Sequence, residues 1–198
     1  MTKIKMCGLR RREDIEYVNK LLPDYIGYVF AEKSKRYISP VKATELTELL
    51  DERIIPVGVF VNETIENIAS AVKSGAIKVA QLHGNESEEE IMALKSKGIP
   101  VIKAFRISCR ADCERAERSC ADFVLLDSGG GSGETFDWSL ISGIKRKFFL
   151  AGGITPENVG EAIEKLAPYA VDASSCLETD GFKDFEKMKA FAEAVGKV

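Results

Sequence analysis

The sequence lacks a long apolar run, a dominant charge and a secretion signal. None of its hydrophobic stretches approaches the roughly 18 residues that span a bilayer, so we expect no membrane partner. Lys and Arg total 28 against 31 Asp and Glu, with no long basic stripe. Because phosphate neutralisation needs clustered cations, we expect no nucleic-acid partner. The charged N-terminus also does not continue as the apolar core of a signal peptide.

Cysteine and histidine are scarce and show no metal or disulfide spacing. Five cysteines cannot all pair within one chain, which predicts reduced thiols and a cytoplasmic protein. The single histidine, His83, is a poor basis for a metal site, and we expect a hydrogen-bonded structural role for it. Cys109, Cys113 and Cys120 are expected on one helix face, where no fourth ligand suggests a metal.

What the 198 residues do contain is an alternation of strand and helix patterns. Short β-branched or aromatic runs, each suited to a strand buried on both faces, alternate with amphipathic stretches such as 63–75 and 156–168, where Pro156 is expected in the first helical turn. The runs cover residues 3–7, 25–30, 55–61, 78–83, 100–105, 122–127, 147–152 and 169–174.

Eight such units, each a strand followed by a helix, predict an α/β fold. The expected architecture is a (β/α)8 TIM barrel, with residues 1–198 forming a single catalytic domain. A doubly wound open sheet is the alternative. It usually has fewer strands and a glycine-rich first turn, whereas the first turn here reads Cys7-Gly8-Leu9-Arg10.

In a TIM barrel the active site lies at the carboxyl ends of the strands, which here carry two small-residue turns. Gly152 and Gly153 follow the seventh run, and Ser174 and Ser175 follow the eighth. Backbone N–H groups of glycine turns and serine hydroxyls bind anions, so we expect a phosphate at these turns. The alternative is that the glycines only form a tight turn and the serines only cap a helix.

The stretch after the sixth run, 127–138, is rich in glycine and contains Gly133. It lacks the lysine of a Walker A motif, because Glu134 follows Gly133. It predicts a flexible loop suited to closing over a substrate. Asp137 is then expected as the N-cap of the next helix and Trp138 as a packing residue.

Nine short segments with a recognisable order are spread over nearly the whole chain. They are Cys7-Gly8, Gly27-Tyr-Val-Phe30, Lys33-Ser-Lys-Arg36-Tyr-Ile-Ser-Pro40, Val57-Gly-Val-Phe-Val-Asn62, Gln81-Leu-His-Gly84, Leu126-Asp127, Gly133-x-x-Phe136-Asp137-Trp138, Leu150-Ala-Gly-Gly153 and Asp172-x-Ser-Ser175. Each segment is weak evidence alone, but nine in this order are specific. Together they resemble the phosphoribosylanthranilate isomerase family of tryptophan biosynthesis.

The resemblance implies a cofactor-free Amadori rearrangement of a small phosphoribosyl substrate by a monomer or homodimer, with no metal. By resemblance, Cys7 is the general base, Asp127 is the general acid, and Arg36 binds the anthranilate carboxylate. A solvated loop charge is the alternative reading of Arg36. The other substrate-binding residues that it implies are Gly133, Gly152, Gly153, Ser174 and Ser175.

Both acid–base roles place demands on the surroundings. Cys7 needs a nearby cation or helix N-terminus to work as a thiolate near neutrality. Asp127 needs burial or negative charge nearby to retain a proton. The chain departs from the family at Cys176 and Leu177, where we expect glycine and a small residue; the larger side chains are expected to crowd the phosphate turn.

Three alternative functions remain at the level of the sequence. A related sugar isomerase of histidine biosynthesis would use aspartates at both acid–base positions, whereas the first strand here ends in Cys7. A phosphosugar aldolase would need a Schiff-base lysine inside the barrel, for which Lys103 is the candidate. A non-catalytic phosphate-binding barrel is the third alternative. Arg106 ends the fifth run and is assigned no definite role.

Overall fold

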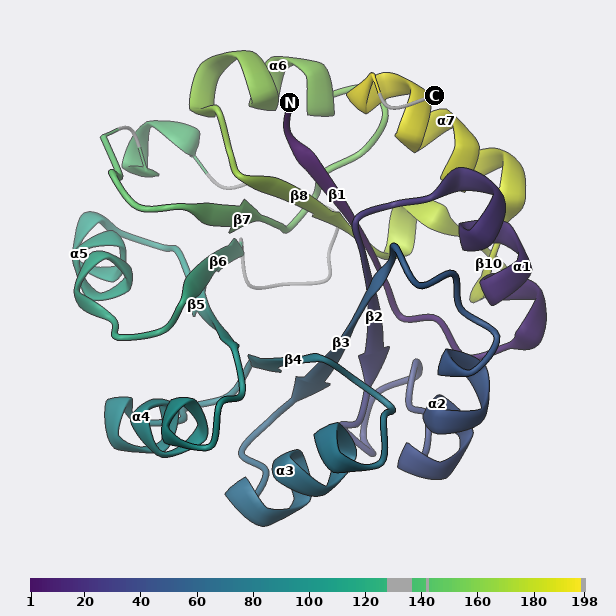
Figure 1. Ribbon diagram of the computed structural model, residues 1–198. Coiled ribbons are helices and arrows are strands. Elements are labelled where there is room, and N and C mark those ends of the chain that lie inside the picture. Colours follow the sequence, from purple (N-terminus) through teal and green to yellow (C-terminus); the bar gives the residue numbers. More distant parts are fainter. Residues whose placement is uncertain (128–136, 142, 197–198) are drawn as a thin grey trace.

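The protein is a closed barrel of eight parallel strands surrounded by helices (Figure 1). This computed structural model describes residues 1–127, 137–141 and 143–196. The strands pair in chain order, and β8 closes the barrel against β1. They are β1 (Lys3–Cys7), β2 (Tyr25–Val29), β3 (Ile55–Phe60), β4 (Val79–Leu82), β5 (Val101–Arg106), β6 (Phe123–Asp127), β7 (Phe148–Leu150) and β8 (Ala170–Ala173). The predicted (β/α)8 barrel and all eight strands are therefore confirmed.

Helices follow the strands on the outside of the barrel, with one exception (Figure 1). After β6 the helix in the described part of the chain is a short 3-10 helix, η1 (Trp138–Ile141), rather than an α-helix. Asp137 caps this short helix as predicted, because its carboxylate accepts the Ser139 N–H at 2.9 Å. The α-helices are α1 (Arg12–Leu21), α2 (Pro40–Thr47), α3 (Ile65–Lys73), α4 (Glu88–Ser96), α5 (Arg110–Arg118), α6 (Val159–Leu166) and α7 (Phe185–Val195).

Two local helix predictions need correction. Helix α6 begins at Val159 after the N-cap Asn158, so Pro156 lies ahead of the helix rather than in its first turn. Helix α5 ends at Arg118, which leaves Cys120 beyond it, and the three thiols do not share one helix face. Between β8 and α7 the chain also forms the 3-10 helix η2 (Ser175–Leu177) and a hairpin of β9 (Glu178–Thr179) and β10 (Phe182–Lys183).

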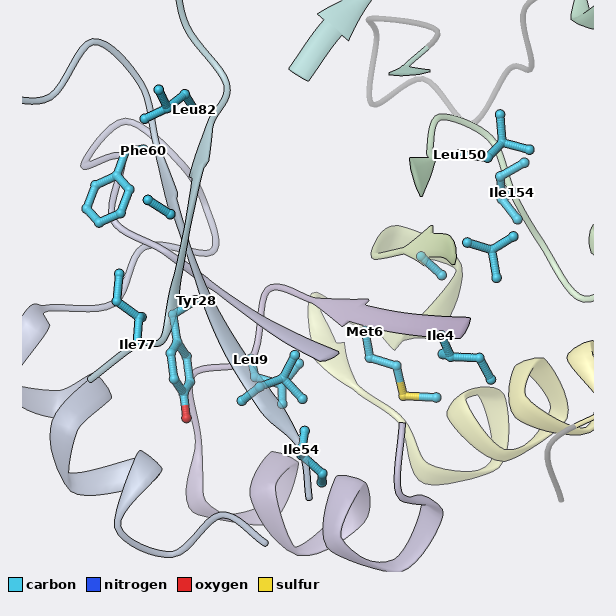
Figure 2. Close-up of a cluster of buried hydrophobic side chains, with 14 of the residues drawn as sticks. Ile4, Met6, Leu9, Tyr28, Ile54, Phe60, Ile77, Leu82, Leu150 and Ile154 are labelled. Atoms are coloured by element: carbon cyan, nitrogen blue, oxygen red, sulfur yellow. The ribbon is translucent and has the colours of Figure 1, made fainter. Parts of the chain in front are cut away.

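Strand alternation divides the core into two layers. Ile4 and Met6 of β1 point outward and join the cluster between barrel and helices, part of which Figure 2 shows. Lys5 and Cys7 alternate with them and therefore face the barrel interior. The interior cluster consists of Tyr25, Val57, Val79, Ile102, Ala104, Leu125, Phe149, Ala151 and Ala170.

Aromatic rings fill the barrel near the amino ends of its strands. Phe149 packs edge-on against Tyr25 and Phe123, with ring centroids 5.3 Å and 5.7 Å apart. Tyr169 stacks on Phe123 at 4.8 Å. The opposite end of the barrel is where polar side chains face the interior. No helix in the described part of the chain combines the length and apolar character needed to cross a membrane.

Candidate active site

A cavity of about 1400 Å³ opens at the carboxyl ends of the strands. Its lining includes every predicted catalytic or substrate-binding residue that the structure describes: Cys7, Arg36, Asp127, Gly152, Gly153, Ser174 and Ser175. Gly133 and the loop predicted to close over the substrate lie outside the described residues. The sequence thus predicted residues that are far apart along the chain but share one cavity.

Cys7 lies at the end of β1 and is 9% exposed. It pairs in register with Gly27 of β2, and a Cβ atom at Gly27 would lie 2.5 Å from the Cys7 sulfur. That distance is shorter than any real contact, so glycine is needed at position 27 to leave room for the thiol.

Two buried lysines supply the positive charge expected near the thiol. Lys5 is two residues earlier on the same inward face, fully buried, with its ammonium 2.8 Å from the Asp172 carboxylate on β8. Lys183 lies in β10 and is 4% exposed. Burial raises the pKa of the Cys7 thiol, whereas Lys5 and Lys183 lower it, and the net pKa is above the ordinary thiol value. The expected cations are present, but they do not outweigh burial in the ligand-free protein.

Asp127 ends β6 and contacts His83, which follows β4. His83 Nε2 lies 3.3 Å from Asp127 Oδ2, and the two side chains are 37% and 18% exposed. The other ring nitrogen, Nδ1, lies 3.2 Å from the Gln81 side-chain amide. His83 is hydrogen-bonded as predicted, but its contact with the candidate acid was not foreseen. Single-strand patterns do not reveal which strand ends meet across a barrel.

The two predicted anion-binding turns are adjacent. Gly152 and Gly153 have φ of 80° and 68°, which is the left-handed region that favours glycine. The Asn158 amide donates to the Gly153 carbonyl at 2.8 Å and fixes the turn. The Ser174 hydroxyl donates to the Cys7 carbonyl at 3.0 Å, so its proton is already engaged, while Ser175 is exposed. Backbone N–H groups and Ser175 are therefore the donors that remain for an anion.

The departures from the family at positions 176 and 177 have separate outcomes. Leu177 is fully buried and joins the cluster between barrel and helices. Contrary to the expectation, it therefore does not crowd the phosphate turn. Cys176 lines the cavity, and its thiol donates to the Ile154 carbonyl at 3.2 Å. Burial raises the pKa of Cys176 to about 11, which keeps it a neutral thiol.

Arg36 has partners that the sequence analysis missed. Its Nε and Nη2 donate to the two oxygens of Glu178 at 2.7 Å and 2.8 Å, and Lys183 donates to the same carboxylate at 2.7 Å. Glu178 and Lys183 are paired by the hairpin β9–β10. The Asp180-Gly181 pair between the two short strands is a hairpin-turn signal that was available in the sequence.

Lys103 does not stand free inside the barrel, as an aldolase would require. It shares a strand face with Val101, which packs in the outer cluster, while Ile102 and Ala104 face the interior. Its ammonium donates to Glu86 and to the Gly84 carbonyl, both at 2.7 Å. A lysine held as a charged, hydrogen-bonded ammonium is a poor Schiff-base nucleophile, which counts against the aldolase alternative.

The remaining candidates have lesser roles in the geometry. Arg106 is exposed at the cavity rim. Cys109 is exposed as the N-cap of α5, Cys113 is buried, and Cys120 donates to the Glu88 carbonyl. Within residues 1–127, 137–141 and 143–196, no three His, Cys, Asp or Glu side chains are grouped to hold a metal ion.

Comparison with known proteins identifies the family. The model of the N-(5'phosphoribosyl)anthranilate (PRA) isomerase family matches residues 4–194. An N-(5'-phosphoribosyl)anthranilate isomerase of Thermoanaerobacter sp. (strain X514) is 46% identical, with 98% of each chain covered. The crystal structure of phosphoribosyl anthranilate isomerase from Thermotoga maritima is 39% identical over the full length of both chains, with a TM-score of 0.92. A phosphoribosyl anthranilate isomerase solved with reduced 1-(o-carboxyphenylamino)-1-deoxyribulose 5-phosphate is 38% identical, also over both full lengths, with a TM-score of 0.90. The chain therefore belongs to the N-(5'-phosphoribosyl)anthranilate isomerase family.

Proposed function

We propose that this chain, acting as one catalytic domain, converts N-(5-phosphoribosyl)anthranilate into 1-(2-carboxyphenylamino)-1-deoxyribulose 5-phosphate. Family membership supports the reaction, and a relative binds the reduced form of this product. The observation that carries the assignment to residues is the shared cavity. A thiol, a carboxylic acid, an arginine and two turns of small residues line it together.

In this mechanism Asp127 and Cys7 act in sequence. Asp127 protonates the furanose ring oxygen, and the ring opens to a Schiff base. The Cys7 thiolate then removes the proton from C2 of the sugar, which gives an enolamine that tautomerises to the ketone. Acid–base groups of this kind each contribute about 10²–10⁴-fold to the rate. The contact between His83 and Asp127 offers a route for returning a proton to the acid.

The phosphate and the carboxylate of the substrate contact different residues of the cavity lining. The phosphate binds at Gly152, Gly153 and Ser175; Gly133, which lies outside the described residues, stays a predicted substrate-binding residue. Arg36 binds the anthranilate carboxylate through its terminal Nη1–Nη2 edge. The Nε–Nη2 edge already binds Glu178, and a guanidinium has donors for both.

The reaction uses a free thiol, which fits the reducing environment of the cytosol. A relative from Thermotoga maritima is dimeric, and engineered monomers of it have been solved. We propose that this chain also works as a monomer or homodimer.

The direct test follows the fluorescence of freshly prepared phosphoribosylanthranilate after the purified protein is added. We expect rapid loss of the anthranilate fluorescence and formation of the ketose phosphate. The two-phosphate aminoaldose of histidine biosynthesis serves as the competing substrate. Turnover of that substrate alone would replace the proposed reaction with the first alternative.

Arg36→Ala tests the carboxylate contact. A hydrogen bond to a charged group contributes about 1.5–3 kcal/mol, so product affinity should fall roughly 10–150-fold. Lys should restore it only in part, because an ammonium lacks the planar fork. Binding of product and of inorganic phosphate is measured by calorimetry for both proteins. Equal losses for the two ligands would contradict the assignment of Arg36 to the carboxylate.

A further inference from the structure

A hairpin that follows β8 carries two charged side chains that lie behind Arg36, a residue of the cavity lining. Glu178 of β9 and Lys183 of β10 are register partners in its antiparallel sheet. The turn residues Asp180 and Gly181 have φ of 51° and 78°, both in the left-handed region that two-residue hairpin turns require. The sequence of this hairpin therefore fixes which two side chains face each other.

The hairpin is anchored to the loop after β1. Arg10 donates to the Gly181 carbonyl at 2.8 Å, and Arg11 donates to the Lys183 carbonyl at 2.9 Å. Both guanidinium groups lie over the Phe182 ring, at 4.7 Å and 4.6 Å from its centroid. Contacts on the turn and on β10 hold the hairpin against the barrel.

The Glu178 carboxylate lies between two positively charged side chains, those of Arg36 and Lys183. It receives two hydrogen bonds from the guanidinium and one from Lys183, whose ammonium also donates to the Ser174 carbonyl at 2.9 Å. The side chains of Glu178 and Lys183 are 10% and 1% exposed, whereas that of Arg36 is 31% exposed and lines the cavity. The two hairpin residues thus lie behind the arginine as seen from the cavity.

The charges of these three side chains do not cancel. Arg36 and Lys183 each carry one positive charge and Glu178 carries one negative charge, which leaves one net positive charge. Without Lys183 the arginine would be neutralised by Glu178, and its attraction for an anionic ligand would be lost. Glu178 and Lys183 are almost fully buried, so the charge of each is weakly screened and acts on the guanidinium at close range.

We propose that Glu178 and Lys183 are positioning residues for the carboxylate end of the substrate. Glu178 fixes the plane of the Arg36 guanidinium so that its terminal edge faces the cavity. Lys183 compensates Glu178, so that this edge keeps its full attraction for a carboxylate on an aromatic ring. The inference rests on the proposed function of Arg36 and assigns to the hairpin the selection of a carboxylated substrate.

A purely structural role for Lys183 makes a different prediction. If the ammonium only holds the hairpin and the Ser174 carbonyl, its removal should weaken all ligands of the cavity alike. The positioning role instead affects only the contribution of the carboxylate. Two ligands that differ in that group alone separate the two roles.

The experiment compares the product with its analogue 1-phenylamino-1-deoxyribulose 5-phosphate, which lacks the carboxylate, by titration calorimetry. The wild type should prefer the carboxylated ligand by roughly 10–150-fold. Lys183→Met should reduce this preference by about tenfold or more, and Lys183→Arg should retain it. Lys187→Met is the matched control, because Lys187 donates to the Glu178 backbone carbonyl and not to its carboxylate.

The double variant Glu178→Gln with Lys183→Met gives a second, independent readout. It restores the single positive charge of Arg36, so part of the preference should return relative to Lys183→Met alone. If Lys183→Met does not fold, Lys183→Gln takes its place, since its amide can still donate to the Ser174 carbonyl.

The possible results distinguish failure of the Arg36 assignment from failure of the positioning role of the hairpin. A wild type that binds the two ligands equally overturns the assignment of Arg36 and this inference with it. The positioning role alone is overturned if the wild type prefers the carboxylated ligand and the Lys183 variant keeps that preference. It is also overturned if the double variant shows no stronger preference than Lys183→Met. In both of those cases turnover of phosphoribosylanthranilate by the wild type would still support the proposed function.

Discussion

On the β1–β8 side of the cavity, a buried lysine–carboxylate pair lies next to Cys7, the candidate general base. Lys5 and Asp172 are 2.8 Å apart, and Lys5 acts directly on the charge of Cys7. On the β4–β5 side, a second buried pair serves the backbone instead. Lys103 and Glu86 are 2.7 Å apart, and both also bind main-chain groups of the loops that follow β3 and β4.

The difference shows that similar ion pairs do different work according to what they contact. A pair that borders a titratable side chain changes the chemistry of that side chain. A pair whose remaining donors and acceptors meet backbone groups holds a loop in place. Substitutions near the Lys5–Asp172 pair should therefore change turnover more than stability. Substitutions in the Lys103–Glu86 pair should change stability more than turnover.

Cys7→Ser should give the largest loss of activity. Serine has nearly the size of cysteine but holds its proton far more tightly, so the general base is removed while the packing is retained. We expect turnover to fall by about 10²–10⁴-fold, with product affinity and unfolding midpoint close to wild type. A loss of less than about tenfold would remove Cys7 from the role of base.

Asp127→Asn should give the second largest loss of turnover. The amide has the shape of the acid but cannot donate a proton to the ring oxygen with comparable strength, so we expect a loss of at least about 10²-fold in turnover. Single-turnover kinetics compare the variant with the wild type, and calorimetry confirms that product still binds. Wild-type turnover in a folded variant would move the acid to another group, for which His83, 3.3 Å from the Asp127 carboxylate, is a candidate.

Lys103→Met tests the opposite side of the comparison through stability. It leaves the Glu86 carboxylate buried without its charge partner, which typically costs about 3–5 kcal/mol. Lys95→Met is the matched control, because its pair with Asp122 is 2.9 Å long but partly exposed, and such pairs contribute about 0–1 kcal/mol. Urea unfolding measures both. Similar losses in the two variants would show that burial of the Lys103 pair has no special importance.

The sequence predicted the barrel well because buried parallel strands have a strong local signature. Runs such as 122–127 are apolar on both faces, and their order along the chain is also their order around the barrel. The site followed from a rule of the fold together with the resemblance, since Cys7 and Asp127 both end strands. Alternation alone would have placed Lys103 on the outer face, because its neighbours are inward Ile102 and Ala104.

The contacts that the sequence did not reveal are long-range or energetic. Arg36 and Glu178 are 142 positions apart and meet only because the hairpin after β8 folds back toward the loop after β2. The net pKa of Cys7 depends on the balance of burial against Lys5 and Lys183, and no local pattern gives that balance. Capping is local in principle, yet α6 begins at Val159 after the N-cap Asn158, whose amide donates to the Gly153 carbonyl, a contact that the sequence pattern does not show.

The smallest effect concerns the ionisation of Cys7, and alkylation isolates it. Turnover needs the thiolate together with a protonated acid, whereas reaction with iodoacetamide needs the thiolate alone. Burial raises the pKa of Cys7, so at a given neutral pH less of it is thiolate than in the unfolded chain. The alkylation rate should therefore rise about tenfold per pH unit through neutrality and level off above the midpoint of an ordinary thiol, near 8.5.

Replacing the Lys5–Asp172 pair by Met and Leu sharpens this measurement. An apolar pair of similar volume is tolerated better than a single unpaired charge, so the barrel should still fold. Lys5 lowers the pKa of Cys7 more than Asp172 raises it, so loss of both should move the alkylation midpoint further upward. Mass spectrometry of the Cys7 peptide across a pH series gives the midpoint, and the Lys95→Met protein is the control. A midpoint that falls, or does not move, would mean that Lys5 does not stabilise the thiolate, and the contrast between the two ion pairs would be lost.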